Sequence, residues 1–249
     1  MEIPKIIHCC WFGKNDFPPL VLKCVESWKK YLPDYEIRIW NEDNFDVESV
    51  YFTKEAYKSG NWAFVSDYVR LYALCNFGGV YMDVDVEVVK DFTPVLEGKS
   101  YVTSFTEGDL VTAGFFACVP NHPFIKSVLE FYDKTYTGGE IRYVSNPYVF
   151  TRVADKLYSI REKGAPQDAP DFTVYPMDRF MPFKKNVFGD GAFRITENTY
   201  TVHHGLNSSS RRKKPLKTLL GVARLLIPTK LFLFLKKLHV KRIYKSLFK

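Results

Sequence analysis

The clearest hydrophobic pattern in the chain lies between residues 61 and 89. From residue 62 to 77 the apolar residues recur at three- and four-residue spacing, which is the period of a helix. The pair Gly78-Gly79 then offers the positive φ angles that end a helix. Residues 80–89 are rich in β-branched side chains, which favour a strand. We therefore expect a helix, a glycine turn and a strand in direct succession.

Charged residues interrupt this apolar block at regular positions. Asp67 and Arg70 are three residues apart and share one face of the predicted helix. Because buried charges are costly unless they are paired or bind something, the two form either an intrahelical ion pair or part of a binding site. Asp83, Asp85 and Glu87 alternate along the predicted strand and should point to one side. The two aspartates suit Mg²⁺ or Mn²⁺, whereas we interpret Glu87 as a structural acid.

The segments before this block alternate between strand and helix patterns. Residues 3–12 predict a buried strand, residues 20–31 a helix, residues 36–40 a second strand and residues 41–46 a polar loop. This order predicts an α/β protein with an open, largely parallel sheet that binds ligands at the carboxyl ends of its strands. The sequence has neither a Gly-x-Gly-x-x-Gly fingerprint nor a Walker loop, so a metal would have to hold any phosphate.

The later segments give weaker patterns. We expect strands at 101–105, 111–119, 172–182 and 193–202, helices at 124–132 and from Asn146-Pro147 to about residue 161, and a surface loop at 162–171. The pair His203-His204 closes this part of the chain. An adjacent histidine pair provides either a metal ligand or ordinary hydrogen-bonded imidazoles, and the sequence leaves both open.

Charge divides the chain in two. The net charge is +7, but residues 211–249 contain 13 Lys or Arg and no acid, while residues 1–210 hold 22 basic and 28 acidic residues. We therefore expect one globular domain at 1–210, whose acidic balance argues against a nucleic-acid partner, and a separate basic tail at 211–249.

The tail predicts one or two basic amphipathic helices that break at Pro228. It has no uninterrupted apolar run of the about 18 residues that cross a bilayer. Its Leu, Ile and Phe side chains suit a membrane interface, and its Lys and Arg suit anionic headgroups. A helix docked on the domain and a nucleic-acid-binding tail are the alternatives. We expect binding to an anionic membrane surface.

Cysteine usage bears on the compartment. The five cysteines are odd in number and have no Cys-x-x-Cys spacing, which favours reduced core residues and no zinc site. The N-terminal apolar run is too short for a secretory signal. We expect a cytoplasmic protein that lies on the inner face of the cell membrane.

Four motifs together resemble one family. They are Ile-Pro-Lys-Ile-Ile-His at 3 to 8 with Trp11-Phe12-Gly13, Ser66-Asp67-x-x-Arg70, Gly78-Gly79-x-Tyr81-x-Asp83-x-Asp85, and His203-His204 followed by Ser208. As a set they resemble the DXD-containing glycosyltransferases of family 32, which include bacterial capsule and lipopolysaccharide sugar transferases, with the clostridial toxin glucosyltransferases as distant relatives. The resemblance covers roughly residues 1–210.

This resemblance implies a fold and a reaction. The fold would be of GT-A type, a Rossmann-like open mixed sheet flanked by helices. The enzyme would bind a nucleotide-sugar donor, UDP- or GDP-linked, together with Mn²⁺ or Mg²⁺, and would transfer the sugar with retention of anomeric configuration. Its acceptor would be a glycan or a lipid-linked saccharide in cell-surface polysaccharide synthesis.

The resemblance also implies the donor-binding residues. Trp11 is similar to the aromatic residue that stacks on the donor base. Asp67 and Arg70 match the helix pair that contacts the donor sugar and phosphate. Asp83 matches the aspartate near the ribose and the sugar, and Tyr81 of the same motif belongs to the donor-binding set.

On the metal side, the resemblance makes Asp85 the direct ligand. His203 is similar to the C-terminal residue that completes the metal site, and His204 is the neighbouring candidate. Two departures affect the expected pattern, because Ser208-Ser209-Ser210 stands where Ser-Trp is frequent and Asn146-Pro147 stands where Gly-Pro is frequent.

Two other functions stay open at this point. Residues 81–86 resemble the aspartyl-phosphate loop of haloacid dehalogenase-like phosphatases, although Gly189-Asp190-Gly191 lacks the second acid of their later motif. A non-catalytic protein anchored to a membrane by its tail is the other alternative. For a transferase, no carboxylate pair stands out as acid and nucleophile, which favours a front-face mechanism in which the departing phosphate helps to deprotonate the acceptor.

Overall fold

The computed structural model describes residues 1–106, 109–139, 141, 143–160, 166–182 and 195–206. Its first half contains β1 (Ile6–Cys10), α1 (Pro19–Tyr31), β2 (Glu36–Trp40), α2 (Tyr51–Lys58), α3 (Trp62–Phe77), β3 (Gly79–Met82) and β4 (Val86–Val88). Its second half contains α4 (Thr93–Leu96), β5 (Tyr101–Thr106), β6 (Leu110–Cys118), α5 (Pro123–Thr135), α6 (Asn146–Tyr158), β7 (Gln167–Ala169), β8 (Phe172–Tyr175), α7 (Met177–Phe180) and β9 (Thr201–His203).

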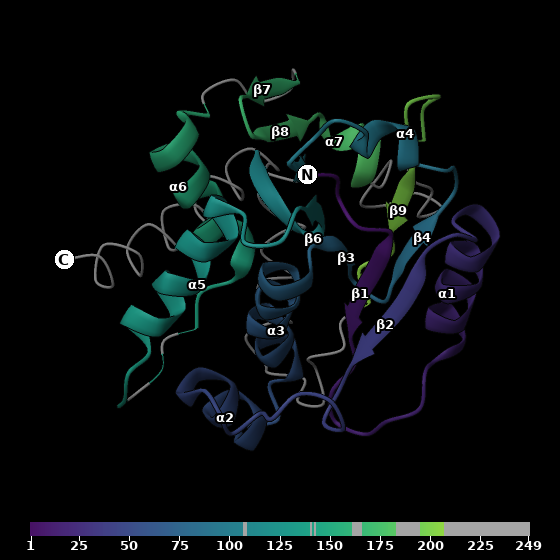
Figure 1. Ribbon diagram of the computed structural model, residues 1–249. Helices are drawn as coiled ribbons and strands as arrows, with labels where there is room; N and C mark the ends of the chain where they lie inside the picture. Colours follow the sequence, from purple (N-terminus) through teal and green to yellow (C-terminus); the bar gives the residue numbers. More distant parts are fainter. Residues whose placement is uncertain (107–108, 140, 142, 161–165, 183–194, 207–249) are drawn as a thin grey trace, which may run out of the picture. The chain divides into compact units, whose positions relative to one another are not determined.

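The main sheet has the strand order β2-β1-β3-β6-β5-β8-β7 (Figure 1). Strands β2, β1 and β3 are parallel, as the sequence predicts for the first half. Beyond β3 the sheet becomes mixed, since β6 runs antiparallel to both β3 and β5, and β7 runs antiparallel to β8. The parallel pairing expected from the first half is confirmed there, and the mixed order agrees with the sheet that the resemblance implies. In the second half β8 is again parallel to β5, whereas β5 and β6 are antiparallel because their connection is too short for a parallel crossover.

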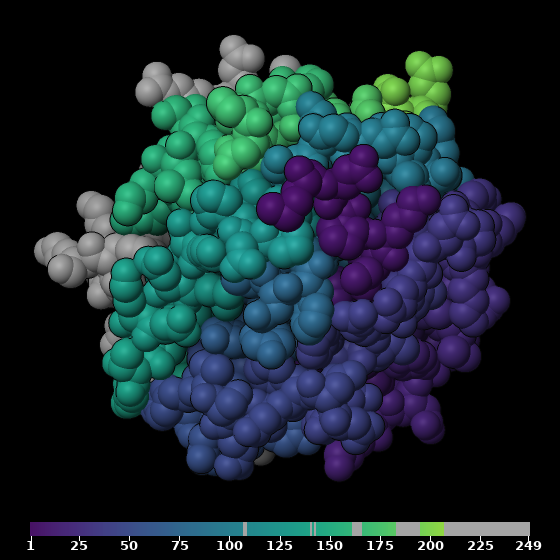
Figure 2. All heavy atoms as spheres, viewed as in Figure 1, coloured from purple at the N-terminus to yellow at the C-terminus, as the bar shows by residue number. Residues whose placement is uncertain are grey.

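Alternating side chains of the central strands face two different layers. His8 and Tyr81 point to the side that α3 covers, and α5 and α6 lie on that side as well (Figure 1). Side chains of α3 and α5 form part of the surface in the space-filling view of this side (Figure 2), and α2 lies against α3. Val80 and Met82 point the other way, into a cluster that also contains Trp28 of α1.

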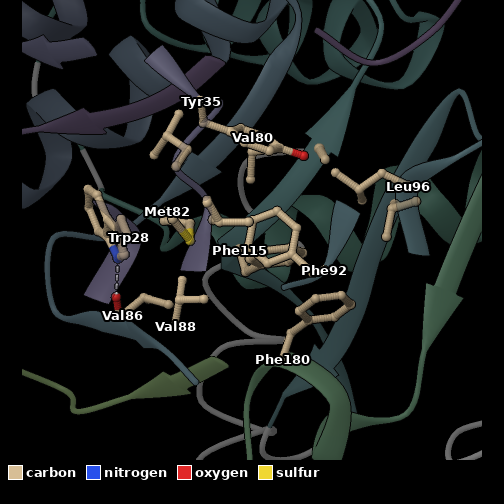
Figure 3. Close-up of a cluster of buried hydrophobic side chains, with 14 of the residues drawn as sticks. Trp28, Tyr35, Val80, Met82, Val86, Val88, Phe92, Leu96, Phe115 and Phe180 are labelled. Carbon is tan, nitrogen blue, oxygen red and sulfur yellow. Dashed lines mark hydrogen bonds between the residues drawn. The ribbon is translucent and has the colours of Figure 1, made fainter. Parts of the chain in front are cut away.

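That cluster is the main hydrophobic core on the second side (Figure 3). Phe115 of β6 stacks on Phe180 of α7 with ring centroids 3.9 Å apart, and Phe92 packs edge-on against Phe115. Each of these rings is fully buried. The core thus fixes β3, β6 and α7 directly beneath the loop that follows β3.

The strand expected at 80–89 is broken in the structure. After Met82 the chain turns, with the N–H of Val86 donating to the carbonyl of Asp83 at 2.9 Å. Strand β4 then leaves the main sheet and pairs antiparallel with β9. Asp83, Asp85 and Glu87 therefore do not alternate along one straight strand.

Helix α1 explains why β4 leaves the main sheet. The indole N–H of Trp28 donates to the carbonyl of Val86 at 2.7 Å (Figure 3), and the N–H of Val88 donates to the hydroxyl of Ser27 at 2.9 Å. Side chains of α1 thus satisfy backbone groups on one edge of β4, while β9 pairs with its other edge.

Other boundaries also differ from the predictions. Helices α2 and α4 were not predicted. The strand expected at 172–182 ends with β8 and is followed by α7, because Pro176 cannot donate to a ladder. Strand β7 lies in the expected surface loop, and the described part of 193–202 is strand only from residue 201.

The tail at 211–249 lies outside the described residues, so its amphipathic helices and the division at residue 210 stay predictions. Within the described ranges, no helix combines the length and the hydropathy that a bilayer crossing requires.

Candidate metal and donor site

The site lies just beyond the carboxyl ends of two neighbouring parallel strands. Strands β1 and β3 pair with Ile7 opposite Val80 and His8 opposite Tyr81. Trp11 follows β1 and Asp83 follows β3, so this register places both at the same edge of the sheet. This is the edge at which the sequence predicts ligand binding, and that binding stays a prediction.

Helix α3 contributes the charged pair on its sheet-facing side. Asp67 and Arg70 are both buried, and Arg70 Nη2 lies 3.1 Å from Asp67 Oδ1. Arg70 also reaches beyond its own helix, because its Nη1 lies 3.4 Å from Asp83 Oδ1 and donates to the carbonyl of Ala113 at 2.6 Å. The intrahelical ion pair is therefore present and also contacts an aspartate of the DXD motif, while donor binding by Asp67 and Arg70 stays a prediction.

Two aspartates and one histidine form the candidate metal group. Asp83, Asp85 and His203 each offer one ligand atom, and these atoms lie within 4.8 Å of one another. His203 Nε2 is 3.1 Å from Asp85 Oδ1 and 3.8 Å from Asp83 Oδ2. Two carboxylates and an imidazole are a ligand set that Mn²⁺ accepts, and Mg²⁺ accepts the carboxylates. These residues therefore fit the divalent cation that the sequence predicts.

Backbone contacts hold Asp85 in this group. The N–H of His204 donates to the carbonyl of Asp85 at 3.0 Å, and the N–H of Leu206 donates to its carboxylate. The chain that follows β9 is thus fastened to the turn that follows β3. The turn after β3 and the residues after β9 thus come together although they are about 120 positions apart in the sequence.

The second histidine of the pair points elsewhere. His204 Nε2 lies 2.8 Å from Glu87 Oε2, and Lys23 Nζ lies 2.9 Å from the other oxygen of Glu87. Of the two histidines that the sequence proposes as metal ligands, the structure brings His203 to the aspartates and brings His204 to Glu87.

Burial and charge shift the protonation of the site residues. Burial raises the pKa of Asp67 to about 7, with the charge of Asp83 adding to the effect and that of Arg70 opposing it. Burial also acts to raise the pKa of Asp85, but the hydrogen bond and the charge of His203 outweigh it and lower that pKa. For His203 burial acts to lower the pKa, and its contact with Asp85 raises it overall. The contact between His203 and Asp85 thus favours the charged form of each residue.

Tyr81 contacts two residues of this site, Asp83 and Arg70. Its side chain is buried, and its hydroxyl donates to Asp83 Oδ1 at 2.9 Å. The guanidinium of Arg70 lies over its ring, 4.6 Å from the centroid. Tyr81 therefore orients two site residues, and its contact with a donor stays a prediction.

The loop after β1 carries Trp11 and has its own anchors. The N–H of Gly13 donates to Glu42 Oε1 at 2.7 Å. Gly13 has a φ of +97°, and a Cβ at this position would lie 2.7 Å from the indole of Trp62, so only glycine fits. The indole N–H of Trp11 donates to the carbonyl of Asn15 at 2.6 Å. The loop is well fixed, and stacking of Trp11 on a donor base stays a prediction.

Gly114 of β6 is a site residue that the sequence analysis missed. A Cβ at this position would lie 3.0 Å from Asp83 Oδ2 and 3.3 Å from His203 Cε1. The absence of a side chain keeps the space beside the metal group open, which supports the fit of a cation there. A lone glycine inside a predicted strand is the signal that would have found it, because such a glycine often marks a close approach of a ligand.

Of the two places that depart from the family pattern, the structure describes Asn146 but not the serines at 208–210. Asn146 is buried, and its amide donates to the carbonyl of Asp67 at 2.9 Å while its Oδ1 accepts from the hydroxyl of Tyr132. Asn146 thus supports α3 behind the site. Ser208, Ser209 and Ser210 lie outside the described residues.

Comparison with known proteins gives two family matches along the chain. Residues 18–102 match the model described as a glycosyltransferase sugar-binding region containing a DXD motif. Residues 117–223 match the model described as an alpha 1,4-glycosyltransferase conserved region. The first match contains Asp67, Arg70 and both DXD aspartates, and the second contains His203.

Individual relatives agree with these matches. Inositol phosphoceramide mannosyltransferase 1 of Schizosaccharomyces pombe is 27% identical over 52% of this chain and 42% of its own length. Mannosyl phosphorylinositol ceramide synthase CSH1 of Saccharomyces cerevisiae is 26% identical over 51% of this chain and 35% of its own length. The chain thus spans less than half of the length of these curated relatives.

Among solved structures, the PaToxG glycosyltransferase is similar in fold. Its TM-score is 0.51 at 21% identity, and the match covers 63% of this chain and 70% of that one. At this level of identity the likeness concerns the fold alone.

Proposed function

The chain belongs to the DXD-motif glycosyltransferases and has their GT-A fold, and from this premise we propose that it transfers a sugar from a nucleotide-sugar donor with the help of Mn²⁺ or Mg²⁺. The convergence of Asp83, Asp85 and His203 beside the buried Arg70 carries this proposal. The donor is UDP- or GDP-linked, and the sugar is transferred with retention of anomeric configuration.

The roles of the metal group follow from its chemistry. Asp83, Asp85 and His203 would hold the cation, which would supply a Lewis acid to the departing diphosphate. Asp85 is the most deeply buried of the three, and three separate groups hold it in place. We assign to Asp85 the largest share of cation binding.

Arg70 supplies a fixed positive charge beside the same group. Its guanidinium is buried and is held by Asp67, by the carbonyl of Ala113 and by the carbonyl of Ser66. A charge that is already oriented stabilises negative charge that develops on the leaving phosphate without further reorganisation. Asp67 orients this charge.

We propose a front-face mechanism because each carboxylate of the site is engaged in a charge pair or directed toward the proposed cation. Asp67 pairs with Arg70, Asp83 accepts from Tyr81, and Asp85 contacts His203. A nucleophile would need a carboxylate that is free to reach the anomeric carbon. An oxygen of the departing phosphate would instead accept the acceptor's proton. Inverted product, or a covalent glycosyl-enzyme trapped at any carboxylate, would contradict this mechanism.

The proposed acceptor is a glycan or a lipid-linked saccharide of the cell surface. One relative is named an inositol phosphoceramide mannosyltransferase and the other a mannosyl phosphorylinositol ceramide synthase. These names support a lipid-linked acceptor and make mannose the first donor sugar to test. The 13 cations of the tail would bring the enzyme to an anionic membrane surface, at about 1 kcal/mol for each charge near the surface. We propose that this surface is the cytoplasmic face of the cell membrane.

A donor screen tests the proposed function. Purified full-length protein is incubated with UDP- and GDP-sugars in the presence of Mn²⁺ or of EDTA, and free nucleoside diphosphate is measured. We expect slow hydrolysis of at least one donor with Mn²⁺ and none with EDTA. Phosphate release from a simple phosphomonoester, without hydrolysis of any nucleotide sugar, would favour the phosphatase alternative instead.

A further inference from the structure

A second polar cluster lies directly behind the metal group. His204 Nε2 is 2.8 Å from Glu87 Oε2, and Lys23 Nζ is 2.9 Å from Glu87 Oε1. These three residues come from the end of β9, from β4 and from α1. Neither the metal group nor the proposed mechanism uses them, and their arrangement calls for a separate explanation.

The register of the two-stranded sheet explains the arrangement. Val86 pairs with His203 and Glu87 pairs with Val202, so Glu87 and His204 are diagonal neighbours on one face. Because successive side chains along an extended chain point to opposite sides, His203 points away from His204 and toward the aspartates. In the structure the contact of His204 with Glu87 therefore accompanies the contact of His203 with the aspartates.

We propose that the contact between Glu87 and His204 positions His203 as a metal ligand. This inference rests on the proposed metal site and assigns His204 to positioning rather than to metal binding. Strand β9 has only three residues, and so short a strand has few ladder hydrogen bonds to fix its orientation. A hydrogen bond between an imidazole and a carboxylate adds a strong directional link at its end.

Lys23 provides a matched control because it contacts the same carboxylate, with its Nζ 2.9 Å from Oε1 and 3.0 Å from Oε2. Its side chain is 62% exposed, whereas those of Glu87 and His204 are only about one-fifth exposed. An exposed lysine contributes little to the position of a carboxylate. Removal of the Lys23 charge therefore tests whether any loss of charge near Glu87 has the same effect as loss of the contact with His204.

The first experiment measures Mn²⁺ binding to full-length protein from the loss of the free Mn²⁺ signal in electron paramagnetic resonance spectra, alone and with UDP or GDP. We expect Glu87→Ala to weaken binding about tenfold to a hundredfold, as loss of a group that orients a metal ligand does. Glu87→Gln keeps an oxygen that accepts from His204 and should stay within a few-fold of the wild type. Lys23→Met should bind as the wild type does.

The second experiment identifies the nitrogen ligand by pulsed paramagnetic resonance of bound Mn²⁺. We expect the nitrogen coupling to disappear in His203→Ala and to persist in His204→Gln. Loss of the coupling in His204→Gln with its retention in His203→Ala would overturn the inference, as would unchanged Mn²⁺ binding in Glu87→Ala. If the wild type binds no Mn²⁺ under any of these conditions, the proposed metal site itself is wrong. That result differs from the two outcomes that would overturn only the positioning role of Glu87 and His204.

Discussion

Asp83 is the residue at which the interactions of the site meet. Its Oδ1 accepts from the hydroxyl of Tyr81 at 2.9 Å and lies 3.4 Å from Arg70 Nη1. Its Oδ2 faces His203 and the open space beside Gly114. One oxygen is thus held by the protein, and the other stays directed toward the metal group. This division orients the carboxylate without occupying the oxygen that a cation needs.

Gly114→Ala tests whether the space beside Asp83 matters. The added Cβ would lie 3.0 Å from Asp83 Oδ2 and 3.2 Å from Met181 Cε, so Asp83 must shift by a few tenths of an ångström. Because a displacement of 1 Å can reduce a rate about a hundredfold, we expect the Mn²⁺-dependent kcat/KM of donor hydrolysis to fall about tenfold, with little change in the thermal unfolding midpoint.

Gly98→Ala is the matched control for this prediction. Its Cβ would meet no atom within 4 Å, but its φ of +69° is unfavourable for alanine. We expect a loss of about 1 kcal/mol in stability and no loss of activity. Equal activities of the wild type and Gly114→Ala would mean that the site does not use this space.

Some contacts of the site could be predicted from the spacing of residues along the sequence. Asp67 and Arg70 could be paired from the sequence because residues three apart on a helix are neighbours whatever the rest of the fold does. The contact of His203 with Asp85 and the place of Gly114 depend on which strands pair and in which register. The pattern of apolar residues does not determine that register, so the residues left the role of the histidine pair open and the resemblance favoured His203.

At the scale of elements, the break between β3 and β4 decides the geometry of the site. Residues 80–89 have strand propensity throughout, so the sequence predicts one strand. The break arises from tertiary partners, because β9 and the side chains of Ser27 and Trp28 bind β4 outside the main sheet. The exact bounds of α3 were predictable because its apolar residues keep helical spacing over a long stretch and Gly78-Gly79 ends the helix.

His8 joins three elements and provides a prediction about pH. In the middle of β1, its Nε2–H donates to the carbonyl of Gly78 at the end of α3, and its Nδ1 accepts from the indole of Trp40 in β2, both at 3.0 Å. Protonation of Nδ1 would place two donors against each other. Burial lowers the pKa of His8 from 6.5 to about 4.

This shift means that the unfolded chain binds a proton more readily than the folded one between pH 6.5 and 4. The stabilising contribution of neutral His8 is complete above pH 6.5 and is lost as the pH falls toward 4. We expect it to account for a loss of about 2 kcal/mol in the free energy of unfolding between pH 7 and pH 5, measured by urea denaturation.

His8→Gln isolates this contribution, because glutamine offers a donor and an acceptor but does not titrate. The difference in stability between the wild type and His8→Gln should shrink by about the same 2 kcal/mol from pH 7 to pH 5. A difference that stays constant over this range would show that His8 does not titrate as its burial requires.

At the scale of the whole molecule, the positive charge is concentrated in residues 211–249, whereas residues 1–210 have an acidic balance. Deletion of residues 211–249 removes 13 cations and no acidic residue. We expect the truncated protein to lose sedimentation with vesicles that contain phosphatidylserine and to keep hydrolysis of a soluble donor. Neutral vesicles serve as the control. If the truncated protein still sediments with the anionic vesicles, another part of the chain binds the membrane.

Asp85→Ala tests whether Asp83, Asp85 and His203 hold the cation that we propose for donor cleavage. The measurement is the Mn²⁺-dependent rate of nucleotide-sugar hydrolysis, with circular dichroism to verify the fold. We predict a loss of two or more orders of magnitude, because the buried Asp85 is the most constrained residue of the group. Equal rates for the wild type and Asp85→Ala would contradict the account.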